Sequence, residues 1–175
     1  MKVFGLKERS AHKYIKKQLK LDEKSQKKSP AIIRRVGILA DTKLFEAYDF
    51  TKKLSENFNM HQADIQLVLY QDSEDDTKDL AHDIFNENDF KLNGKIKSKN
   101  IQHFADTKFD LLINYCDLDN VYANVLVLRS KALLKAGFDS DETPFYDISI
   151  KTQGNKIHTF NEELAKYLHI LNLLK

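Results

Sequence analysis

The sequence predicts an α/β domain in which one open parallel sheet of about five strands lies between two layers of helices. Apolar runs typical of strands alternate with amphipathic segments of helical period, at the spacing of βαβ units. Two of these runs, 31–40 and 109–115, are apolar enough for strands that are covered on both faces. The 175 residues, 42% of them hydrophobic, are sufficient for one substantial core. We therefore expect a three-layer, Rossmann-like domain.

The middle of the chain predicts the central strand and helix of this fold. Residues 109–115 form a nearly continuous apolar run, which indicates a buried strand. The polar turn after it contains Asp117 and Asp119, and either carboxylate can cap the following helix. That helix is expected from about residue 120 to 136, with Gly137 as the left-handed residue that ends it. Its buried face is expected to hold Val121, Val125, Leu128 and Ala132.

The other elements follow the same alternation along the chain. The remaining strands are expected at 31–40, 63–70, 95–97 and 145–151. The remaining helices are expected at 7–20, 43–57, 77–85, 101–107 and 161–174. Because Lys95-Ile96-Lys97 is polar, we place this strand at a sheet edge and the two most apolar strands in the centre. This gives the strand order 3-2-1-4-5, in preference to the flavodoxin-like order 2-1-3-4-5.

Charge is distributed unevenly along the chain. Residues 1–35 contain twelve Lys or Arg and three Asp or Glu, whereas residues 72–89 contain eight Asp or Glu and one Lys. Residues 1–30 therefore read as a basic arm, a helix followed by a linker, and residues 31–175 as a single Rossmann-like domain. With the core expected to begin at Ala31, removal of residues 1–28 should leave the domain folded.

This charge asymmetry indicates a contact between the basic arm and a polyanion, with RNA or a ribonucleoprotein as the favoured partner. Tyr14 could stack on an exposed base. The residues expected to bind nucleic acid are Lys7, Arg9, Lys13, Tyr14, Lys16, Lys17, Lys20, Lys24, Lys27, Lys28, Arg34 and Arg35. The alternative is that the basic helix lies on the acidic segment of its own domain.

A second candidate site is the crevice beyond the carboxyl ends of the first and fourth strands, where the strand order reverses. The residues expected there are Asp41, Thr42, Asn114, Cys116, Asp117 and Asn120. Two carboxylates and an amide can serve acid–base chemistry or hold a metal ion. The alternative is that Asp41 and Asp117 are helix caps and Asn114 is a hydrogen-bonded buried amide.

Several function classes find no support in the sequence. Neither glycine-rich phosphate-binding motif is present, and the six histidines are scattered, so we expect no cofactor and no metal site. One cysteine excludes an internal disulfide. No long apolar stretch and no apolar signal region are present, so a cytoplasmic protein without a transmembrane segment is expected.

The function that these observations favour is that of a non-catalytic binding module associated with RNA or a ribonucleoprotein. Two alternatives stay open. One is a small enzyme or ligand-binding protein that uses the crevice, although no residue is assigned a catalytic role. The other is a peripheral membrane or protein-interaction adaptor, in which the arm contacts anionic lipid or an acidic protein. The oligomeric state also stays open.

Four segments carry a resemblance to a known family: GILAD, FDLLINY, SKALLKAGF and FYDISI. From about residue 31 onward the chain resembles an uncharacterised family of small α/β proteins found in Bacteroidota, which has no known activity and so implies no catalytic residues. Residues 109–138 also look distantly like the N-terminal lobe of heptosyltransferase-type glycosyltransferases. That likeness implies a Rossmann-like fold, whereas the lack of a second lobe in this chain argues against transferase activity.

Overall fold

Six strands form the centre of the molecule. They are β1 (Val36–Asp41), β2 (Ile65–Tyr70), β3 (Asp83–Phe85), β4 (Leu111–Asn114), β5 (Leu134–Phe138) and β6 (Ile148–Ile150). This computed structural model describes residues 5–22, 29–72, 82–139, 145–152 and 156–174. The six strands make one sheet in the order β3-β2-β1-β4-β5-β6. Every neighbouring pair is parallel. The predicted open parallel sheet is confirmed, with one strand more than expected.

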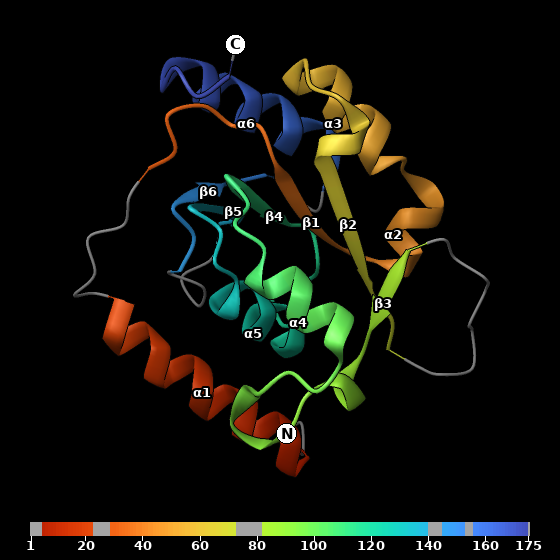
Figure 1. The fold of residues 1–175 in the computed structure, drawn as a ribbon, viewed down its shortest axis with the longest axis vertical. Coiled ribbons are helices and arrows are strands. Elements are labelled where there is room, and N and C mark those ends of the chain that lie inside the picture. The colour runs from red at the N-terminus through yellow and green to blue at the C-terminus, as the bar shows by residue number, and fades with distance from the viewer. Residues whose placement is uncertain (1–4, 23–28, 73–81, 140–144, 153–155, 175) are drawn as a thin grey trace.

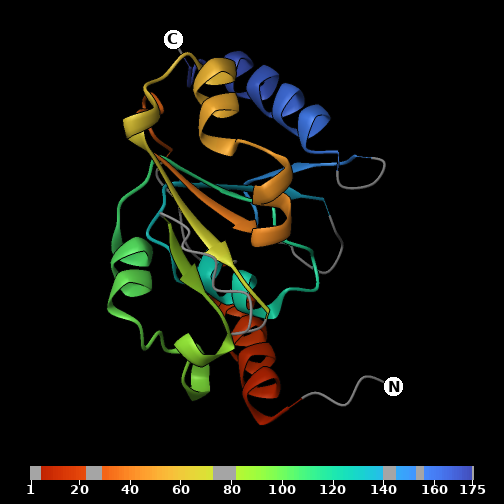
Figure 2. The same cartoon turned by 90° about the vertical axis from the view of Figure 1, so that its right-hand side faces the viewer.

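Six helices and three short 3-10 turns surround the sheet in the described part of the chain. The helices are α1 (Leu6–Asp22), α2 (Thr42–Ala47), α3 (Phe50–Phe58), α4 (Lys99–Asp106), α5 (Val121–Arg129) and α6 (Ile157–Ile170). The turns are η1 (Gln62–Asp64), η3 (Glu87–Asp89) and η4 (Leu92–Gly94). Helices α3 and α6 cover one face of the sheet, and α4 and α5 cover the other (Figures 1 and 2). None of the helices described is long and apolar enough to cross a membrane.

The alternation of side chains along β1 divides the core into two clusters. Ile38 and Ala40 face the cluster that contains the apolar residues of α3 and α6. Leu39 points the other way, into the cluster that contains α4 and α5. Since β1 and β4 are buried on both faces and lie between other strands, the prediction that they form the apolar centre of the sheet is confirmed.

Helix α5 is enclosed on two sides. All residues from Val121 to Val127 are buried, although a helix on the surface of a domain exposes one face to water. The sheet covers one side of α5, and α1 lies across the other side (Figure 1). Ala11 and Ile15 of α1 are buried in the same cluster. The core therefore begins before Ala31, and the expected N-terminal helix is part of it.

Two predictions at the edge of the sheet are wrong: the strand at 95–97 and the described part of the helix at 77–85. Ile96 makes only an isolated antiparallel bridge with Phe90, so 95–97 is not a strand of the sheet. The third strand is β3, which lies in the range predicted as that helix. Residues 77–81 of that predicted helix lie outside the described residues. Phe85 fixes the position of β3, because its side chain is fully buried between the sheet and the second core cluster.

The helix predicted for 120–136 is also too long. It ends at Arg129, and residues 134–138 form β5 beside β4. Gly137 is a strand residue and not a helix terminator. Its hydrogen side chain is required there because a Cβ atom would lie 2.3 Å from the ring of Tyr146.

Two further helices differ from prediction at their ends. The helix predicted for 43–57 is divided into α2 and α3, because the Asp49 side chain accepts a hydrogen bond from the Lys52 amide and starts a new helix. Helix α6 begins at Ile157, four residues before the predicted start of the helix at 161–174, so Asn161 lies inside it. The Asn161 amide is fully buried and bridges the hydroxyls of Tyr48 and Tyr115.

Candidate functional site

The carboxyl ends of β1 and β4 bring most of the predicted crevice residues to one edge of the sheet. Strand β1 ends at Asp41 and β4 ends at Asn114, with Leu39 opposite Asn114 in the register. Helix α2 leaves β1 toward one face of the sheet, and α5 follows β4 on the other. This reversal of direction is the place where open α/β sheets bind ligands.

Two of the predicted residues cap helices at this edge. Asp41 Oδ1 accepts a hydrogen bond from the Lys43 amide at 2.8 Å, at the start of α2. Asn120 Oδ1 accepts one from the Ala123 amide at 2.9 Å. The cap of α5 is therefore Asn120 and not Asp117 or Asp119, because a side chain directly before the first helical residue reaches the free amides of the first turn.

Asn114 and Cys116 are structural parts of the same edge. Asn114 is 1% exposed, and both polar atoms of its amide are hydrogen-bonded: Oδ1 accepts from the Cys116 amide at 3.0 Å, and Nδ2 donates to the Tyr146 hydroxyl at 2.8 Å. Burial, reinforced by the carboxylates of Asp41 and Asp117, raises the pKa of the Cys116 thiol well above its usual range. Cys116 is therefore a buried neutral thiol at physiological pH, which is a poor nucleophile.

A cavity of about 460 Å³ opens beyond these strand ends. Asp41, Asp117 and Asn120 line it, whereas Thr42, Asn114 and Cys116 do not. The other lining residues come from α1, α2, β2, η3, α5 and the turns beside them: Glu8, Lys43, Tyr70, Asp72, Glu87, Asp119, Val121 and Tyr122. A cavity therefore lies where the crevice is predicted, and three of the six predicted residues line it.

The cavity is strongly acidic, with six carboxylates and one lysine in its lining. The Tyr70 hydroxyl donates to Asp72 at 3.2 Å and the Tyr122 hydroxyl to Glu87 at 3.4 Å. Burial and these carboxylates raise the pKa of Tyr70 well above its usual value and the pKa of Tyr122 to about 12. An environment of this charge repels phosphate groups and attracts cations. Among the described residues, no group of three or more His, Cys, Asp or Glu side chains is arranged to hold a metal ion.

The second candidate surface is α1, which is held in place by its inner face. Ala11 and Ile15 are 3% and 9% exposed, and the Ser10 hydroxyl accepts a hydrogen bond from the Asn93 amide at 2.8 Å. The Arg129 guanidinium lies 4.7 Å from the centre of the Tyr14 ring and donates to the Gly94 carbonyl. Tyr14, which the sequence offered as a stacking ring, is used here to join α1 to α5 and η4.

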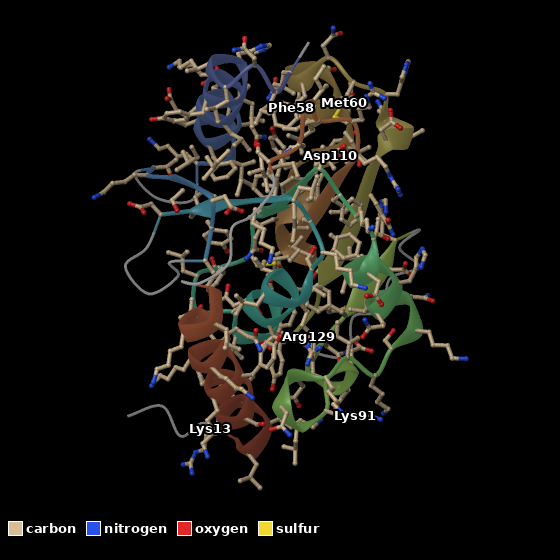
Figure 3. The ribbon with its side chains drawn as sticks, turned by 60° about the vertical axis from the view of Figure 1, so that its left-hand side comes forward. Lys13, Phe58, Met60, Lys91, Asp110 and Arg129 are labelled. Carbon is tan, nitrogen blue, oxygen red and sulfur yellow. The ribbon has the colours of Figure 1, made fainter. Side chains whose placement is uncertain are left out.

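The outer face of α1 carries the cations. Six of the predicted nucleic-acid-binding residues lie on this helix and are exposed: Lys7, Arg9, Lys13, Lys16, Lys17 and Lys20. Lys7 donates to the neutral amide of Asn88 at 3.1 Å, and none of the six forms an ion pair with a described acidic residue. Figure 3 shows Lys13 on the outer side of α1 and Arg129 on the inner side, beside the η4 turn.

The other five predicted cations are Lys24, Lys27, Lys28, Arg34 and Arg35. Lys24, Lys27 and Lys28 lie outside the described residues. The backbone amides of Arg34 and Arg35 both donate to Asp110 Oδ2 at 2.9 Å, at the amino ends of β1 and β4. Figure 3 shows Asp110 in the upper part of the molecule and Lys13 near its lower end, so the two arginines do not extend the surface of α1.

Comparison with known proteins gives a family and no activity. Residues 7–171 match the sequence model of a family of unknown function (DUF6913). The match includes nearly all of α1 together with the sheet and its helices. No curated protein matches the chain.

Proposed function

We propose that this chain, which belongs to the DUF6913 family, binds RNA in the cytoplasm through the outer face of α1. One observation carries the proposal. The inner face of α1 is fixed by buried contacts, and five exposed cations on its outer face have no described acidic partner: Arg9, Lys13, Lys16, Lys17 and Lys20. Lysines and arginines placed in this way bind phosphates, and the release of counterions from the nucleic acid supplies much of the affinity.

The spacing of the lysines suits a phosphate backbone. Lys13, Lys16, Lys17 and Lys20 stand three, four and seven residues apart on one α-helix. Residues three or four apart on a helix have their Cβ atoms about 5–6 Å apart. The four side chains therefore form one stripe about 10 Å long, at the rise of an α-helix. Exposed Lys91 and Lys95 flank η4, which packs against α1.

The test compares two lysines of α1 with two arginines that directly precede β1. Fluorescence anisotropy with labelled RNA measures the affinity of the full chain between about 50 and 200 mM salt. With four phosphate contacts to a single strand, the slope of log K against log salt should be about −3. The double variant Lys16→Gln/Lys17→Gln should make this slope shallower by about 1.4, and the control Arg34→Gln/Arg35→Gln should leave it unchanged.

Two results would overturn this proposal. Equal weakening by the two double variants would mean that α1 is not the contact surface. An affinity for anionic vesicles without salt-dependent RNA binding would favour the peripheral membrane adaptor instead.

The acidic cavity supports a second candidate function, the binding of a small cationic ligand. The supporting observation is that a cavity of about 460 Å³ lies at the reversal of strand order and is lined by six carboxylates. The same charge argues against a sugar nucleotide, which the resemblance to the glycosyltransferase lobe would imply, because its diphosphate would face these carboxylates.

Isothermal titration with spermidine as the probe tests this second candidate. Asp41→Asn/Asp117→Asn should weaken binding at least about tenfold, since each charge near a cation contributes on the order of 1 kcal/mol. Asn still offers the oxygen that caps α2, so the fold should persist. Asp64→Asn, an exposed acid at the amino end of β2, is the matched control. This function would be contradicted if Asp41→Asn/Asp117→Asn bound spermidine as tightly as Asp64→Asn does, or if the parent protein did not bind spermidine.

A further inference from the structure

We infer that the RNA bound by α1 is a duplex recognised through its phosphates, and not a single strand recognised through its bases. This inference rests on the proposed function and specifies the class of RNA. It follows from the use of Tyr14 in the packing of α1 and from the rigid placement of the neighbouring lysines.

The ring of Tyr14 is held between two other elements. The Arg129 guanidinium lies over the ring at 4.7 Å from its centre, and Arg129 also donates to the Gly94 carbonyl. Gly94 has a φ of +65°, and a Cβ atom at this position would lie 3.0 Å from the ring. A base that stacked on Tyr14 would have to displace Arg129 and separate α1 from η4.

The described part of this surface offers no other fully exposed ring to a base. The one further ring among residues 5–22 is His12, which is half-buried and already interacts with another group. Phe90 is the one aromatic residue among residues 86–100. Phe90 is 3% exposed and packs against the ring of Tyr122. Proteins that bind single strands combine a basic groove with exposed aromatic side chains on which successive bases stack. The outer face of α1 has the cations of such a site without the stacking platform.

The cations themselves suit a rigid partner. Buried Ala11 and Ile15 fix the rotation of α1, so the stripe of Lys13, Lys16, Lys17 and Lys20 keeps one position on the surface. An RNA duplex presents phosphates at fixed positions, whereas a flexible single strand must be ordered to match the same stripe. Phosphate contacts carry no base information, so binding should be independent of sequence.

The experiment compares a duplex of about 20 base pairs with a U-rich single strand of the same length, using the full chain in the anisotropy assay. The duplex should bind at least about tenfold more tightly at one salt concentration, and two duplexes of unrelated sequence should agree within about twofold. With four contacts the salt slope should be about −3.6 for a duplex and about −2.8 for a single strand. Lys16→Gln/Lys17→Gln should weaken the duplex, and Arg34→Gln/Arg35→Gln should not.

The possible failures are distinguishable. Equal or tighter binding of the single strand would overturn the inference and leave RNA binding by α1 intact. A photocrosslink from 4-thiouridine to Tyr14 would also overturn it, because the ring would then be in contact with a base. Failure of both RNAs to bind would overturn the proposed function itself.

Discussion

Substitution of Ile15 by alanine tests whether α1 is docked as the structure describes. Ile15 is 9% exposed and lies in the cluster between α1 and α5. The change removes three methyl or methylene groups, and each contributes about 0.8 kcal/mol when it is buried. We therefore expect a loss of about 2–3 kcal/mol in the free energy of unfolding, at the lower end of the range for such truncations. The adjacent Lys16→Gln, on the exposed face, should change stability by less than about 0.5 kcal/mol.

Urea unfolding followed by circular dichroism measures both variants. The slope m should be unchanged, because the packing and not the extent of unfolding is altered. In a thermal scan, Ile15→Ala should lower Tm by about 5–10 °C for a domain of this size. A loss below about 1 kcal/mol, or equal effects of the two adjacent substitutions, would refute the docking of α1 on α5.

Three other predictions follow from burial and contacts in the rest of the domain. Leu126→Ala removes a fully buried side chain and should lower the free energy of unfolding in urea by about 3–5 kcal/mol. Leu128→Ala removes a half-buried side chain and should lower it by about 1–2 kcal/mol, so equal losses would contradict the assigned helix face. Gly137→Ala places a Cβ atom 2.3 Å from the Tyr146 ring and should cost about 3 kcal/mol; a variant as stable as the parent would show that the ring can move freely. Tyr122 should ionise near pH 12, because burial and adjacent carboxylates raise its pKa from 10 to about 12. The protonated Tyr122 hydroxyl therefore stabilises the folded state fully below pH 10, and this contribution is lost between pH 10 and 12. The difference in alkaline absorbance between the parent and Tyr122→Phe measures this pKa, and ionisation near pH 10 would contradict it.

The centre of the fold could be predicted because burial on both faces leaves a clear pattern. Strands β1 and β4 are enclosed by helices on each side, so their sequences are apolar without alternation. The same pattern placed them next to each other in the sheet, as the structure has them. The crevice follows from this order. Asp41 could be predicted there because it ends β1, and Asp117 and Asn120 because they lie in the turn between β4 and α5.

The edges of the sheet were harder to predict because their sequences do not favour strands by themselves. Strand β5 contains Lys135, Ala136 and Gly137, which are weak strand formers, and the helical period of the preceding residues continues into it. Its pairing with β4 and the Tyr146 ring over Gly137 determine its conformation. Strand β3 has three residues, too few for a periodic signal, and it depends on the pairing of Phe85 with Tyr70.

The cavity includes residues that no local pattern could have placed there. Glu8 reaches it only because α1 docks on α5, and Glu87 reaches it through the η3 turn. One signal was present in the sequence: α5 is apolar around its whole circumference, which means that something besides the sheet has to cover it. The apolar stripe of Ala11 and Ile15 on the basic arm is the matching surface.

The two faces of α1 also decide how its function can be tested. Removal of residues 1–28 would take Ala11 and Ile15 out of the core and expose the outer side of α5 to water. Domains are typically stable by only about 5–15 kcal/mol, so the loss of a whole helix from the core should unfold a large fraction of the protein. Loss of RNA binding after that deletion would not distinguish a missing contact surface from a missing fold. Substitutions confined to the lysines of the outer face leave the inner contacts intact, and they therefore separate the binding role of α1 from its structural role.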